Sequence, residues 1–171
     1  PATMRTTRDL LRRRLYFARK RGEFFSHIRM TFQQHNQPFP STGQLRYEKH
    51  RQGLVEAFDD PALRATIEAD LALVDRYDTV LRDLERTIED QAQVHDPDAL
   101  ELLRTIPGVG KILALTLLYE IHHIGRFGSV QQFSSYSRLV KSEHRSAGKR
   151  TGSGGAKIGN AHLKWAFSEA A

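Results

Sequence analysis

The stretch from Ser142 to Asn160 combines the side chains that chemistry on a phosphodiester would need. It holds serine hydroxyls, and five glycines lie between residues 146 and 159. A serine oxygen can attack phosphorus while nearby cations neutralise charge on the equatorial oxygens, and glycines let the backbone fold closely around a phosphate. The same composition is usual in flexible or disordered loops that only contact phosphates, and the residues alone favour that interpretation over a nucleophile. The cations of the stretch are Arg145, Lys149, Arg150 and Lys157.

A second motif, Ile106-Pro-Gly-Val-Gly-Lys111, resembles the turn of a helix-hairpin-helix DNA-binding element. Gly108 and Gly110 allow a tight turn and a close approach to phosphate, and Lys111 adds charge where a helix is expected to begin. Such a turn reads the phosphate backbone and not the base sequence. The alternative interpretation is a structural turn between two packed helices. A nucleotide-binding P-loop is excluded because Ile112 follows the lysine in place of serine or threonine.

Metal and cofactor sites are not expected within this chain. It has no cysteine, which excludes disulfides and thiolate ligands. Glu120-Ile-His122-His123 lacks the four-residue spacing that puts two imidazoles on one helix face. The remaining carboxylates concentrate on one long helical segment, where a solvated face is the ordinary interpretation.

A long basic helix is expected from Thr6 to about Gln34, because apolar residues recur at helical spacing. Two prolines and a glycine in residues 36–43 end it. Seven cations lie within 14 residues of this helix, and they repel one another unless phosphates or carboxylates lie alongside. The candidate nucleic-acid contacts here are Arg12, Arg13, Arg14, Lys20 and Arg21.

A second long helix is expected to begin at Asp59-Asp60-Pro61 and to end at Asp96-Pro97. From Leu63 to Ile88 its apolar residues follow alternating three- and four-residue steps for about four heptads, which is the pattern of a coiled coil. This seam must pack against the first helix, against a second copy of the chain, or against both. We therefore expect a homodimer through the coiled coil, or a tetramer.

The remaining segments favour short helices at residues 98–105, 111–121, 130–140 and 160–170, and none alternates as a strand. The predicted fold class is all-α. A long helical hairpin or coiled coil is expected over residues 1–97. A small helical domain, residues 98–171, is expected to hold the helix-hairpin-helix element and the glycine-rich serine loop.

Charge is divided unevenly along the 171 residues, whose net charge is +6. Residues 1–52 hold 12 basic and 3 acidic side chains, residues 53–103 hold 4 and 14, and residues 104–171 hold 10 and 3. Two basic ends favour a polyanionic partner such as nucleic acid. The acidic middle can also pair with a basic segment along a helical hairpin, and both interpretations can hold together.

The composition argues against a membrane protein. Charged residues make up 27% of the chain, the mean hydropathy is −0.52, and no apolar run approaches the length of a spanning helix. The first residues lack the apolar core of a signal peptide. We therefore expect a cytoplasmic protein with no membrane partner.

Five motifs follow one another along the chain. They are Arg8-Asp-Leu-Leu-Arg-Arg-Arg14, Ile106-Pro-Gly-Val-Gly110, Phe127-x5-Phe133-x2-Tyr136-x2-Leu139, Arg145-Ser146-Ala-Gly-Lys149 and Lys157-Ile-Gly-Asn160-x2-Leu163-Lys164. This ordered series resembles the IS one-ten group of insertion-sequence transposases. The resemblance implies a coiled-coil segment followed by the serine-bearing C-terminal transposase domain.

The resemblance also implies a mechanism. Ser146 would be the nucleophile, with Ser142 and Ser153 as alternatives, in a protein that cuts and rejoins DNA through a covalent serine–DNA intermediate. A structured non-coding RNA would guide it. Members of the group begin with a RuvC-like domain whose four acidic residues bind Mg²⁺, and this sequence is expected to be a fragment without that domain. We therefore expect it to bind nucleic acid weakly and to be inactive alone.

Two non-catalytic interpretations compete with this one. In the first, the chain is a binding module that holds nucleic acid through the helix-hairpin-helix element and the basic helix, while the rod dimerises. In the second, it is only an oligomerisation piece, which would be wrong if sedimentation showed a monomer.

Overall fold

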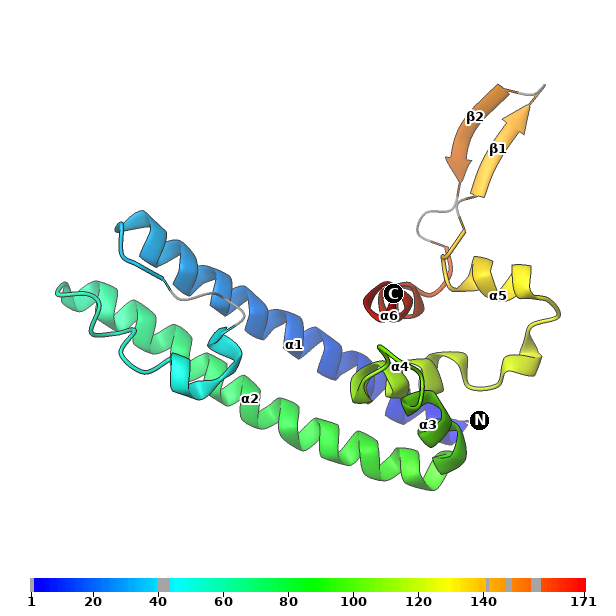
Figure 1. Ribbon diagram of the computed structural model, residues 1–171, viewed down its shortest axis with the longest axis horizontal. Helices are drawn as coiled ribbons and strands as arrows, with labels where there is room; N and C mark the ends of the chain where they lie inside the picture. Colours follow the sequence, from blue (N-terminus) through cyan, green and yellow to red (C-terminus); the bar gives the residue numbers. More distant parts are fainter. Residues whose placement is uncertain (1, 40–43, 141, 147–148, 155–157) are drawn as a thin grey trace. The chain divides into compact units, whose positions relative to one another are not determined.

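The computed structural model describes residues 2–39, 44–140, 142–146, 149–154 and 158–171 (Figure 1). The chain forms two compact units, one of Pro1–Leu11 with Ile88–Ala171 and one of Arg12–Thr87. Two long helices, α1 (Ala2–Gln34) and α2 (Pro61–His95), contribute to both units. The sequence domains expected at residues 1–97 and 98–171 are a separate division and stay a prediction.

The two long helices form where the sequence predicts them. α1 begins at Ala2, a turn before the expected Thr6, and ends at Gln34 as expected. α2 has the predicted bounds. It begins at Pro61 because Asp60 Oδ1 accepts hydrogen bonds from the backbone N–H groups of Ala62 (2.8 Å) and Leu63 (3.1 Å). In the unit Arg12–Thr87 the helices run antiparallel and side by side (Figure 1).

The heptad seam of α2 is buried within one chain. In the unit Arg12–Thr87, Ile67 and Val74 of α2 form one cluster with Phe25, Ile28 and Phe32 of α1. The segment between the helices, which contains the 3-10 helices η1 (Gln44–Arg46) and η2 (Glu48–His50), adds the buried side chains Leu45, Leu54 and Phe58. The first helix is therefore one partner of the seam, and pairing of two copies stays a prediction.

The other unit is built around α4 (Lys111–Ile121), whose predicted bounds are confirmed. All seven residues from Ala114 to Glu120 are buried. α4 contacts α3 (Pro97–Arg104) and α6 (Ala161–Ala170), and its core also takes in Leu11, Ile88 and Leu100. Two shorter elements, η3 (Ile124–Arg126) and α5 (Val130–Tyr136), lie between α4 and the hairpin. α5 ends four residues before the expected position 140.

A two-stranded antiparallel hairpin corrects the expectation that no strand is present. β1 (Ser142–Ser146) pairs with β2 (Lys149–Gly154) in the stretch predicted to be a loop. Hydrophobic alternation detects strands that bury one face on a core, and these two segments contain no large hydrophobic residue to give that signal. The rest of the described chain has the helical fold expected for the all-α class.

Candidate functional site

The Pro-Gly-Val-Gly motif forms the turn between α3 and α4. Gly108 has a φ of +83°, and the N–H of Val109 donates to the carbonyl of Ile106 at 3.0 Å. Gly110 is the N-cap of α4, with no side chain to satisfy the first N–H groups of the helix. A Cβ added to Gly110 would meet no atom within 4 Å, so this side of the turn is open. The turn therefore has the geometry of an anion site, and its use in DNA binding stays a prediction.

Two contacts of this turn were not evident from the sequence. A Cβ on Gly108 would lie 2.8 Å from the carbonyl oxygen of Ala170, so Gly108 allows α6 to pack closely against the turn. Lys111 Nζ lies 3.4 Å from Glu89 Oε2, which gives this candidate phosphate contact a carboxylate neighbour. Part of the motif therefore serves packing within the unit.

A buried pair, Glu120 and Asn160, joins α4 to the start of α6. Asn160 Nδ2 donates to Glu120 Oε2 at 2.6 Å, and the two residues are 6% and 3% exposed, respectively. Asn160 Oδ1 caps α6 by accepting from the N–H groups of His162 (2.9 Å) and Leu163 (3.1 Å). Sequence reasoning considered Glu120 only as a metal ligand and did not find this pair. The Asn-x2-Leu spacing, with a capping residue ahead of an apolar helix, was the available signal.

The same asparagine helps to tie the two ends of the segment that carries the hairpin. The Asn160 N–H donates to the carbonyl of Tyr136 at 2.6 Å, and Arg138 Nε donates to the carbonyl of Ile158 at 3.0 Å. Gly159, at a φ of +95°, leaves room for the Tyr136 carbonyl, which a Cβ would approach to 2.6 Å. The chain therefore leaves α5 and returns to α6 at one anchored base.

Arg126 and Tyr136 surround this base. The Arg126 guanidinium lies over the rings of Phe127 and Tyr136, at 4.6 and 4.8 Å from their centroids, and donates to the carbonyl of Glu120 at 3.3 Å. Burial opposes ionisation of Tyr136, but hydrogen bonding to Asn160 and Arg126 outweighs it and lowers the Tyr136 pKa below the ordinary value. The positive charge of Arg126 is therefore held beside the anchored base of the serine-bearing segment.

The predicted nucleophile lies at the end of β1. In the backbone register Ser146 pairs with Lys149, and Arg145 pairs with Arg150. The alternative serines, Ser142 and Ser153, pair with Gly154 and Glu143. The side chains of these residues, and the whole of residue 157, where Lys157 was expected to contact nucleic acid, lie outside the described part of the structure.

The basic residues of α1 are divided between internal pairing and exposure. Arg14 pairs with Glu85 at 2.5 Å, and Arg21 pairs with Asp78, both across to the acidic α2. Lys20 pairs with Glu23 on its own helix at 2.7 Å. Arg13 is exposed, and its guanidinium carbon lies 6.0 Å from the ring centroid of Phe17. The interpretation that acidic and basic segments pair along a helical hairpin is therefore confirmed for two arginines.

The described residues offer no metal centre. Within them, no group of three or more His, Asp or Glu side chains is placed to hold a metal ion. In the same part of the chain, every helix is too short or too polar to cross a bilayer.

The comparisons with known proteins give one match. The model described as Transposase IS116/IS110/IS902 family matches residues 100–171, which contain the turn, the Glu120–Asn160 pair and the hairpin. No curated protein and no solved structure matches the chain. Residues 100–171 are therefore similar to the transposase domain of the IS116/IS110/IS902 family.

Proposed function

We propose that the chain is part of a DNA transposase that cuts and rejoins DNA with Ser146 as its nucleophile. The observation that carries this proposal is the hairpin within the transposase domain. Its register puts Ser146 opposite Lys149 and Arg145 opposite Arg150, so one serine and three cationic residues share one end of a short hairpin. Phosphoryl transfer needs a hydroxyl nucleophile and positive charge at the same place.

The proposed reaction is a pair of transesterifications. The Ser146 oxygen forms a bond to a DNA phosphorus, the bond from phosphorus to one deoxyribose oxygen breaks, and that oxygen leaves as a hydroxyl after taking up a proton. The serine proton passes to solvent. In the second step a hydroxyl of another DNA end attacks the same phosphorus and loses its proton to solvent, while the bond from phosphorus to the Ser146 oxygen breaks and that oxygen regains a proton. Arg145, Lys149 and Arg150 would neutralise the phosphoryl oxygens in both steps.

The anchored base of the hairpin supports this assignment. Asn160, Gly159 and Arg138 hold the two ends of the serine-bearing segment against α5. A nucleophile must be held near its productive geometry, and a segment fixed at both ends loses less freedom when it meets DNA than one fixed at a single end. The base is thus where the fold can position Ser146.

Three further parts of the proposal rest on the resemblance to the transposase group. A structured RNA would guide the protein to its DNA, and two or four copies would assemble. Magnesium-binding acids would come from a RuvC-like domain outside these residues, and no step above uses a metal held by the described side chains. The chain alone would bind nucleic acid weakly and would not turn over, and its cytoplasmic location stays a prediction.

A non-catalytic binding module is the second candidate. The open N-terminus of α4 at Gly110 and the exposed Arg13 favour it, because both would contact phosphates without any chemistry at Ser146. Lys111→Ala combined with Gly110→Ala should weaken DNA binding and lower its salt dependence under either candidate. This pair of changes therefore tests binding alone.

A recombination assay in the full-length protein separates the two candidates. Ser146→Ala should abolish strand joining while DNA binding is retained, because only the attacking oxygen is removed. Ser142→Ala and Ser153→Ala are matched controls on the same hairpin and should recombine normally. Recombination by Ser146→Ala at the rate of the unchanged protein would remove the nucleophile and leave the binding module. Loss of activity in Ser142→Ala or Ser153→Ala alone would move the assignment to that serine.

A further inference from the structure

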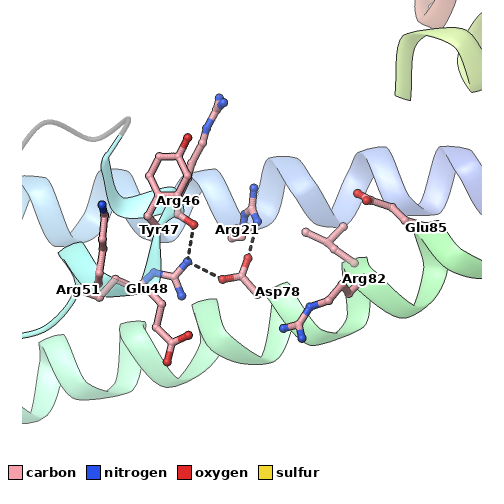
Figure 2. A pocket seen from close by; sticks show the side chains of 10 residues that line it. Arg21, Arg46, Tyr47, Glu48, Arg51, Asp78, Arg82 and Glu85 are labelled. Carbon is pink, nitrogen blue, oxygen red and sulfur yellow. Dashed lines mark hydrogen bonds and ion pairs between the residues drawn. The ribbon is translucent and has the colours of Figure 1, made fainter. Parts of the chain in front are cut away.

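The unit Arg12–Thr87 contains a hollow that the proposed DNA chemistry does not use. Its volume is about 540 Å³, and its lining comes from α1, from α2 and from the segment Arg46–Arg51 (Figure 2). Five cationic side chains and three carboxylates line it. The cations are Arg21, Arg46, Lys49, Arg51 and Arg82, and the carboxylates are Glu48, Asp78 and Glu85.

The less exposed charged residues of the lining, here called the floor, are Arg21, Arg51, Asp78 and Glu85. Internal ion pairs neutralise the charges of these four residues. Arg51, 7% exposed, donates to Asp78 at 2.5 Å and to Asp75 at 2.6 Å, and Arg21 also pairs with Asp78. Glu85, the other paired carboxylate of the lining, pairs with Arg14. The floor carboxylates thus have cationic partners and do not compete for the charge at the rim.

The rim keeps its positive charge. Arg46, Lys49 and Arg82 are exposed, and none of the three forms an ion pair with another described residue. Glu48 is the rim's one carboxylate and likewise has no cationic partner among the described residues. The rim therefore offers three cations against one acid to a ligand that enters the hollow.

An exposed aromatic ring stands among these cations. Tyr47 is 63% exposed, and its one ring contact within the described residues is an edge-on approach to His50 at 6.2 Å. Arg51 holds the backbone on the N-terminal side of Tyr47, because its guanidinium donates to the carbonyls of Leu45 (2.8 Å) and Arg46 (3.3 Å). Figure 2 shows the side chains of Arg46, Tyr47 and Arg82 around the hollow. The Tyr47 ring is therefore exposed to solvent on a segment whose backbone is held by Arg51.

We propose that this hollow binds an unpaired nucleotide of a single-stranded nucleic acid. The base would stack on Tyr47, and the flanking phosphates would contact Arg46, Lys49 and Arg82. A duplex is a poor fit because its bases are already stacked and cannot pack on a tyrosine face. RNA and single-stranded DNA share the base and phosphate chemistry that the hollow recognises. The site lies outside residues 100–171, and it does not depend on Ser146 being a nucleophile.

Binding of labelled oligonucleotides to the full chain tests the proposal. The probes are a short oligoadenylate RNA, the DNA of the same sequence and the matching DNA duplex. Tyr47→Ala should weaken single-strand binding about ten-fold without changing its salt dependence, and Tyr47→Phe should bind normally. Arg82→Gln should lower the slope of affinity against salt by about 0.7, because one phosphate contact is lost.

The matched control is Arg76→Gln, which removes the same charge from an exposed position of α2 outside the hollow. It should leave both affinity and slope unchanged. Tighter binding of RNA than of DNA would assign the site to RNA, and equal binding would assign it to any unpaired strand. A loss in Tyr47→Ala that is as large for the duplex as for the single strands, unchanged single-strand affinity in Tyr47→Ala, or an equal loss in Arg76→Gln would overturn the proposal.

Discussion

Asn160 Nδ2 donates to Glu120 Oε2 at 2.6 Å, and this bond connects α4 to the residue that caps α6. Because the backbone N–H of Asn160 also donates to the Tyr136 carbonyl, the residue holds three parts of the chain together. These are α4, the end of α5 and the start of α6. The serine-bearing segment departs from and returns to this junction.

Reversing the Glu120–Asn160 pair tests its contribution to stability. Asn160→Asp keeps an oxygen to cap α6 but sets two buried carboxyl groups against each other, so the free energy of unfolding should fall by about 3 kcal/mol. Adding Glu120→Gln restores a donor and an acceptor in the opposite order and should recover most of the loss. Urea denaturation of the three proteins measures both effects. If the double variant is no more stable than Asn160→Asp, the bond is not the source of the stability.

The two glycines of the turn should respond differently to alanine. Gly108→Ala should lower the free energy of unfolding by about 1–3 kcal/mol, because φ is +83° and the new Cβ would lie 2.8 Å from the Ala170 carbonyl oxygen. Gly110→Ala should cost a few tenths of a kcal/mol, since its surroundings are open and its φ is −75°. Thermal denaturation compares them. Equal losses would show that α6 does not pack on Gly108.

Tyr119 should give the chain a distinctive stability profile in alkali. It is 2% exposed, and burial raises its pKa to about 12 from the ordinary value of 10.0. The folded state therefore holds this proton more tightly than the unfolded state, and the stability it contributes is present below pH 10 and lost between pH 10 and about 12.

Tyr119→Phe isolates this effect. Near neutral pH the variant should be less stable by about 1 kcal/mol, because the hydrogen bond between Tyr119 and His95 Nδ1 is lost. The gap between the two proteins should narrow and then reverse as the pH rises from 10 to about 12, since only the unchanged protein has this proton to lose and its pKa shift outweighs the hydrogen bond. Tyr16→Phe, at an exposed position, controls for the removal of a tyrosine. A gap that stays constant over this range would contradict the account.

The long helices could be predicted because their signals are local. The cap at Asp60, the proline that follows it and the heptad steps define α2, and the apolar run defines α4. The hairpin could not be predicted, because pairing between backbone groups of Ser142–Ser146 and Lys149–Gly154 leaves no trace in hydrophobic alternation.

The candidate sites could be predicted from the sequence less well than the fold. Sequence charge suggested that Arg14 and Arg21 would meet nucleic acid, whereas the antiparallel pairing of α1 and α2 gives them Glu85 and Asp78. The sequence analysis assigns no element to residues 46–51, and their arrangement depends on Arg51 donating to two carbonyls and two carboxylates. Such contacts depend on which helix faces meet, and residue spacing alone does not determine that.

The covalent serine–DNA intermediate is the most direct test of the central claim. The full-length protein is incubated with labelled DNA and quenched in denaturant, and the DNA-linked peptide is identified by mass spectrometry. We predict a nucleotide attached to the Ser146 oxygen, and no adduct in Ser146→Ala. An adduct on another residue, or joined DNA without any covalent intermediate, would contradict the assignment of Ser146 as the nucleophile.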